Sequence, residues 1–203
     1  MSEVVEIQLE RLSAEAFAPF GQLICARGDE PPVFEGPHLR SWRQDFEVLG
    51  PTELMYIHYV HQPIEFSTFE RHFQVTQTFI ALGGAASVMV VAAPTGRERV
   101  PEPRELRAFF VPGTVGLMLW RGTWHALTRF PATPGGAGFA FLTDANTQRE
   151  LEQQRADGTP PRLTQEIDYR ERYDVSFKVV DPDGLLVAAA GACASAPSPP
   201  GSA

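Results

Sequence analysis

Residues 69–84, FERHFQVTQTFIALGG, constrain the fold of this chain most, because polar and apolar side chains alternate along them. Successive side chains of a β-strand point to opposite faces, so Glu70 and His72 share one face. The alternation is interrupted and then resumes, which places Gln77 at the start of a second strand. The segment therefore predicts two strands that carry a carboxylate, an imidazole and an amide.

A second segment, residues 120–128 with the sequence WRGTWHALT, has a related pattern. Gly122 allows the backbone to turn sharply, and His125 follows on a new strand. Carboxylate, imidazole and amide groups are groups that bind metal ions and small substrates. We therefore expect Glu70, His72, Gln77 and His125 to converge inside one β-barrel.

Short runs of strand-forming residues recur along the rest of the chain, separated by glycine and proline turns. Residues 5–9 alternate as an edge strand would, Gly83-Gly84 predicts a hairpin into the apolar strand 87–92, and Pro112-Gly113 predicts another turn. Further strands are predicted at 22–26, 39–46, 53–61, 106–111, 115–120 and 139–143, and a loop is predicted at 28–36. A short helix should follow the cap Ser13, and a polar helix should span 145–156. This pattern is typical of an all-β barrel or sandwich with a few short helices.

The chain length of 203 residues suits one domain with a sizeable core. Residues 188–203 read AAAGACASAPSPPGSA, and this composition buries too little apolar surface to offset the entropy lost on ordering. We therefore predict a single domain over residues 1–187 and a disordered tail over residues 188–203.

Charge and composition exclude several classes of partner. A net charge of −8 argues against nucleic-acid binding, which requires a basic surface. The longest apolar runs are too short to span a membrane, and the acidic N-terminal sequence does not resemble a signal peptide. Cys25 and Cys193 stand at opposite ends of the chain, so we expect no disulfide framework and a cytoplasmic location.

One carboxylate, two imidazoles and one amide make a ligand set that suits Ni, Mn, Fe or Zn. The alternative is that Glu70 pairs with an arginine at the barrel mouth and no metal ion binds. His58 and His61 are three residues apart, so on a strand at most one of them faces the interior. Arg71 should point away from Glu70, toward a surface or interface partner.

These residues carry a resemblance to a known family. FERHFQVTQTFIALGG and RGTWH resemble the two signature motifs of the cupin superfamily, with Glu70 and Gln77 in place of the usual histidine and glutamate. The altered set, E-R-H…TQ-x-F-I with W-H, is similar to the ureidoglycolate lyase family, as is the opening LSAEAFAPFGQLI. The resemblance implies a cupin-type double-stranded β-helix, or jelly-roll, a divalent metal ion such as Ni or Mn, and a homodimer.

The resemblance also implies an activity, the cleavage of ureidoglycolate, a small carboxylic acid, to glyoxylate and urea in purine and allantoin catabolism. It assigns catalytic roles to His125, His72 and Glu70. Arg40 would hold the substrate carboxylate. The other expected substrate contacts are Gln77, His58 and Tyr59, of which Tyr59 stands near the place of a family arginine.

The chain departs from the family where the usual E-R-H-P-L-G and W-H-H-P are replaced by E-R-H-F-Q-V and W-H-A-L. A changed site leaves two other classes open. One is a related cupin enzyme acting on another small hydroxy or keto acid, including a non-haem iron oxygenase, because two histidines and one carboxylate also bind Fe(II). The other is a non-catalytic cupin that binds a small acid.

Overall fold

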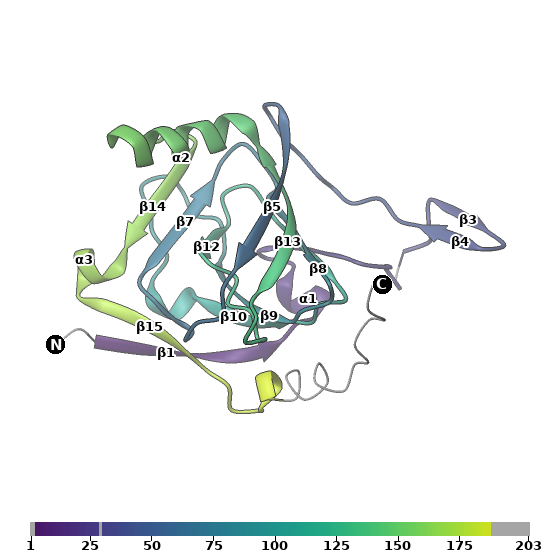
Figure 1. Cartoon of the computed structure of the whole chain (residues 1–203), viewed down its shortest axis with the longest axis horizontal. Helices are drawn as coiled ribbons and strands as arrows, with labels where there is room; N and C mark the ends of the chain where they lie inside the picture. The colour runs from purple at the N-terminus through teal and green to yellow at the C-terminus, as the bar shows by residue number, and fades with distance from the viewer. Residues whose placement is uncertain (1–2, 29, 188–203) are drawn as a thin grey trace, which may run out of the picture.

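Two curled β-sheets pack against each other in a computed structural model that describes residues 3–28 and 30–187 (Figure 1). The larger sheet contains, in spatial order, β14 (Thr164–Asp168), β7 (Thr68–His72), β12 (Trp124–Ala126), β9 (Ser87–Ala92), β10 (Arg107–Val111), β1 (Glu3–Arg11), β15 (Val175–Val180) and β6 (Glu65–Phe66). The smaller sheet contains β2 (Gly21–Ile24), β11 (Gly116–Leu119), β8 (Thr78–Leu82), β13 (Ala137–Asp144) and β5 (Thr52–Tyr59). The predicted all-β, cupin-type barrel is confirmed. The tail predicted for residues 188–203 lies outside the described residues.

Short helices and one hairpin complete the described chain. The helices are α1 (Ala14–Phe17), α2 (Ala145–Asp157), α3 (Tyr169–Tyr173) and a 3-10 turn at Pro103–Glu105. Ser13 caps α1 as predicted, since its hydroxyl accepts a 3.1 Å hydrogen bond from the Ala16 N–H. β3 (Phe34–Gly36) and β4 (Leu39–Ser41) form a separate hairpin that projects from the barrel (Figure 1). No helix within the described ranges has the length and apolar character needed to cross a bilayer.

The barrel interior is lined by alternate residues of both sheets. Met89 and Val91 of β9 pack with Phe79 of β8 and Phe109 of β10 in one cluster, while Val90 faces a second cluster on the other side of the larger sheet. All six residues of β9 are therefore buried, which explains its apolar sequence after Ser87.

The glycine turns join the two sheets instead of closing hairpins. Gly83 and Gly84 have φ angles of 85° and 73°, as a tight turn requires, but β8 lies in the smaller sheet and β9 in the larger one. The predicted hairpin at this position is wrong. The Pro112-Gly113 turn likewise leads from β10 in the larger sheet to β11 in the smaller one.

Two further strand predictions are corrected by the structure. Residues 5–9 belong to β1, which is an interior strand, because β1 pairs in parallel with both β10 and β15. The strand predicted at residues 39–46 ends at Ser41, and the predicted loop contains β3 at Phe34–Gly36. Local alternation marks a strand but carries no information about its neighbours in the sheet.

We predict that Gly113→Ala lowers the free energy of unfolding by about 1–3 kcal/mol. A Cβ atom on Gly113 would lie 2.0 Å from the carbonyl carbon and oxygen of Gly84, so the two inter-sheet turns could not keep their contact. Gly135→Ala is the matched control, because nothing lies within 4 Å of its added Cβ. Chemical denaturation followed by circular dichroism measures both; equal stabilities of the two variants would contradict the close approach.

Candidate active site

Strand pairing brings Glu70, His72 and His125 together on the inner face of the larger sheet. β12 pairs antiparallel with β7 and places His125 directly opposite Glu70. Glu70 Oε1 lies 3.5 Å from His72 Nε2 and 3.9 Å from His125 Nδ1, and the two imidazole centroids are 5.2 Å apart. The sequence-predicted convergence of these three side chains is therefore seen in the structure.

Hydrogen bonds orient the two imidazole rings. His72 Nδ1 contacts the Thr164 hydroxyl at 2.9 Å, and His125 Nδ1 donates to the Ala126 carbonyl at 3.0 Å. The second bond places the proton of a neutral His125 on Nδ1 and leaves the lone pair on Nε2. Both Nε2 atoms are buried and have no hydrogen-bond partner among residues 3–28 and 30–187.

The cluster has the donors of a metal centre. Glu70, His72 and His125 each offer a ligand atom, and these atoms all lie within 4.8 Å of one another. Gln77, buried in the same cavity, has an Oε1 atom that likewise lacks a partner in the described chain. Nitrogen and oxygen donors left unsatisfied in one place fit a divalent metal ion.

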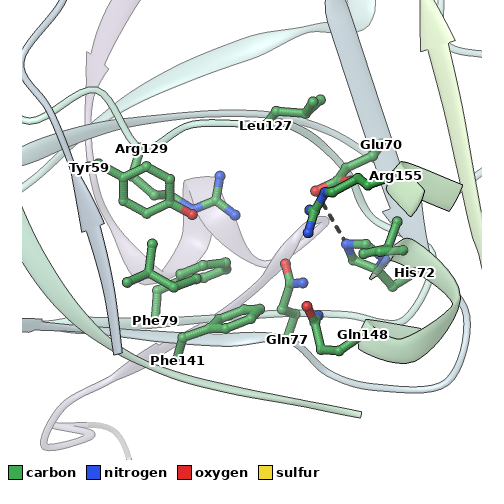
Figure 2. Close-up of a pocket in the computed structure, with 12 residues that line it drawn as sticks. Tyr59, Glu70, His72, Gln77, Phe79, Leu127, Arg129, Phe141, Gln148 and Arg155 are labelled. Carbon is green, nitrogen blue, oxygen red and sulfur yellow. Dashed lines mark ion pairs between the residues drawn. The ribbon is translucent and has the colours of Figure 1, made fainter. Parts of the chain in front are cut away.

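A cavity of about 260 Å³ opens from this cluster (Figure 2). Phe79 and Phe141 stack with their centroids 4.8 Å apart on one wall. One face of α2 also lines the cavity, with Gln148, Leu151 and Arg155 spaced at three and four residues. These three residues were not predicted from the sequence, because a helical spacing in a polar helix does not show which surface the helix covers.

Arg129 supplies a buried positive charge in the same cavity. It is 2% exposed, donates to the carbonyl oxygens of Ala126 and Thr128, and stacks over the Phe79 ring at 3.8 Å. No carboxylate of the described chain forms an ion pair with it, and its Nε has no hydrogen-bond partner there. Arg129 was not predicted as a site residue, although a lone arginine within the segment ALTRFP was an available signal.

Burial and neighbouring charges set the ionisation of the site. Burial alone would raise the pKa of Glu70, but His72, His125 and Arg129 together lower it to about 2. Burial and then Arg129 lower the pKa of His125 to about 3. The site therefore presents a carboxylate and a neutral imidazole at pH 7. Burial raises the pKa of Tyr59, which keeps its phenol protonated as a donor.

Not every predicted site residue reaches the cavity. Tyr59 and Gln77 line it, but Arg40 lies exposed on the β3–β4 hairpin and pairs with Glu35 at 2.7 Å. His58 is exposed on the outer side of β5, the opposite face from Tyr59. His61, also exposed, contacts the Pro131 carbonyl through Nδ1 at 2.8 Å.

Arg71 points away from Glu70 as expected, but it is fully buried instead of lying at the surface. Its guanidinium donates to Gln165 and Thr95 and to backbone carbonyls, and stacks over Trp124 at 4.3 Å. These contacts hold β7 from its outer side.

The barrel and its interior cluster define a cupin-type protein with a small-molecule site. A model of the ureidoglycolate lyase family matches residues 4–159. The chain is 30% identical over 132 residues to a ureidoglycolate lyase of Burkholderia cepacia, covering 62% of this chain and 73% of the relative. It is 35% identical over 124 residues to that of Pseudomonas syringae pv. syringae, covering 58% and 71%. The chain belongs to the ureidoglycolate lyase family and is a lyase.

We predict that Arg129→Met does not lower the free energy of unfolding by more than about 1 kcal/mol, and that it can raise it. Methionine keeps the packing and removes a buried charge that has no ion partner. The same variant should bind glyoxylate, a small carboxylate, at least ~10-fold more weakly. Chemical denaturation and titration calorimetry measure the two effects. Arg40→Met, at an exposed pair, is the control and should change neither. A loss of ~3–5 kcal/mol in the Arg129 variant would instead mark that residue as structural.

Proposed function

We propose that this protein cleaves ureidoglycolate to glyoxylate and urea. The observation that carries the proposal is a buried arginine without an ion partner in the described chain, in the same small cavity as a carboxylate–imidazole cluster. Such a pair of features suits a small anionic substrate that undergoes proton transfer. The names of the relatives, ureidoglycolate lyases, support the same substrate.

The reaction needs three kinds of group. The substrate carries a hydroxyl, a carboxylate and a ureido nitrogen on or beside one carbon. Loss of the hydroxyl proton allows the oxygen to form the aldehyde, while the C–N bond breaks and the nitrogen leaves with its electron pair as urea after gaining a proton. The net change moves one proton from oxygen to nitrogen, so a single positioned acceptor can take it and return it.

The side chains of the cavity match these requirements. Arg129 binds the substrate carboxylate, and the protonated Tyr59 hydroxyl is a second donor in the same cavity. Glu70 accepts the hydroxyl proton and delivers it to the departing nitrogen. Neutral His125 donates its Nδ1 proton to the Ala126 carbonyl, which leaves its buried Nε2 lone pair free to bind a metal ion. Phe79 and Phe141 keep water from one wall.

A divalent metal ion, Ni or Mn, fits the same cluster. Glu70, His72 and His125 would hold it, with the Gln77 oxygen as a fourth candidate ligand. When bound, such an ion lowers the pKa of a coordinated hydroxyl and fixes the pose of the substrate. A carboxylate has two oxygens, so Glu70 can serve as both ligand and proton acceptor.

We predict that the purified protein releases urea from ureidoglycolate under argon, which an oxygenase could not do. Glu70→Gln should lower kcat by about 10²- to 10⁴-fold, because it removes the proton acceptor. His125→Ala should lower both kcat and bound metal, and chelation of the wild type should reduce urea release until Ni²⁺ or Mn²⁺ is added back. Urea release and metal content are measured on the same preparations.

Glu35→Gln, at the exposed pair with Arg40, is the control and should keep full activity. Wild-type rates in folded Glu70→Gln and His125→Ala proteins would refute the proposed site. A wild-type protein that binds glyoxylate but never releases urea would refute the proposed reaction.

The proposal extends to a homodimer formed through the outer face of the smaller sheet. Strand register places Tyr56, Ala140 and Ile80 in one row across β5, β13 and β8, and Leu82 lies one row away. Tyr56, Ile80 and Leu82 are 66%, 37% and 48% exposed. An apolar row on an exposed sheet face supports an interface between identical copies.

We further propose one catalytic domain over residues 1–187 and a cytoplasmic location, in line with the composition.

We predict that Tyr56→Arg converts a dimer into a monomer, because it places a charge in the apolar row. Light scattering coupled to size-exclusion chromatography gives the mass of each species. Val4→Arg, at an exposed apolar residue of the other sheet, is the matched control and should stay dimeric. A wild-type protein that runs as a monomer at all concentrations contradicts the proposed interface.

A further inference from the structure

The inner face of α2 closes one side of the cavity and is firmly held. Asp144 caps the helix by accepting from the N–H and the hydroxyl of Thr147. Glu150 accepts from the backbone N–H groups of Arg162 and Leu163, which ties the helix to the segment leading into β14. Side chains on the cavity face of α2 are therefore presented from a fixed element, as a specificity site requires.

Gln148 is a polar side chain on this face with unused hydrogen-bonding capacity. Its Nε2 donates to the Thr143 hydroxyl at 3.3 Å, which orients the amide, and no donor in the described chain contacts its Oε1. Gln77, the residue before β8, lines the same cavity and is 4% exposed, and its Oε1 also lacks a partner in those residues. Figure 2 shows both amide groups pointing into the cavity.

The proposed function leaves one part of the substrate without a binding group. Arg129 takes the carboxylate, and the Glu70 cluster takes the hydroxyl. The ureido end is neutral and carries both N–H donors and a carbonyl acceptor. Each glutamine amide carries one acceptor oxygen and an NH₂ donor group, so two of them can satisfy a ureido group. An apolar or anionic group in the same place would leave the buried Gln77 oxygen unsatisfied, at a cost in binding.

We propose that Gln77 and Gln148 form the subsite for the ureido group and so restrict the leaving group to neutral, amide-like ones. The inference rests on the proposed function and names the residues that would select its substrate. Gln148 is the sharper test of the pair, because it lies outside the candidate metal ligands.

The test compares Gln148→Met with the wild type in urea release and in competitive inhibition by glyoxylate, which has no ureido group. Methionine keeps the length of the side chain but removes its acceptor and donor. We expect KM for ureidoglycolate to rise about 10- to 100-fold, kcat to change less than KM, and the inhibition constant of glyoxylate to stay within about twofold. Gln153→Met, on an exposed position of α2, is the matched control and should leave all three values unchanged.

The outcomes separate this inference from the proposed function. A wild type that releases no urea refutes the function, whereas an active wild type with an unchanged KM in Gln148→Met refutes the subsite. A parallel loss of glyoxylate affinity would show general damage to the cavity and also overturn the assignment. Gln77→Met should raise KM and keep the metal content; loss of metal from that variant would make Gln77 a ligand and remove it from the subsite.

Discussion

The site depends on the register of three adjacent strands, β14, β7 and β12. Their pairing places Glu70 opposite His125 and His72 opposite Thr164. A slip of one residue would turn Glu70 and His72 out of the barrel and bring Arg71 inside. Arg71 opposes such a slip, because its buried guanidinium is satisfied only by the acceptors on the outer side of β7. The same strand thus carries the reactive groups on one face and the residue that fixes their direction on the other.

The cavity lowers the stability of the fold, and this cost indicates that the cavity serves to bind a ligand. Two Nε2 atoms, the Gln77 oxygen and the Arg129 Nε are buried without hydrogen-bond partners in the described chain. Each buried unsatisfied group costs about 1–3 kcal/mol, so a barrel selected for stability alone would fill these positions with apolar residues. Arg129, Gln77 and His72 line one cavity and differ in chemistry: a cation, an amide and an imidazole. A ligand with matching anionic and neutral polar parts would satisfy them together.

The sequence predicted the parts of the site that depend on local geometry. Alternation identified the shared face of Glu70 and His72, and the turn at Gly122, with φ of 81°, preceded His125 as expected. Arg129 could not be found in this way, because its role follows from burial beside Phe79, a residue 50 positions earlier in the chain. Arg40 was assigned from its place in the family pattern, and the structure puts it on a projecting hairpin. Gly83-Gly84 and Pro112-Gly113 marked real turns, but sheet packing decides whether such a turn closes a hairpin or crosses to the other sheet.

The departures from the family motifs fall mostly outside the cavity. Phe73, at the place of a proline, stacks beneath Arg71 and Arg97 at 5.0 and 4.2 Å on the outer side of the strand. Ala126, at the place of the second histidine, is buried in the core cluster on the face opposite His125, so no inward-facing ligand is lost there. Leu127 alone of these three lines the cavity. Arg129 supplies a buried positive charge beside Tyr59 in the cavity. The altered sequence therefore changes the surroundings of the site more than the charged and proton-accepting groups within it.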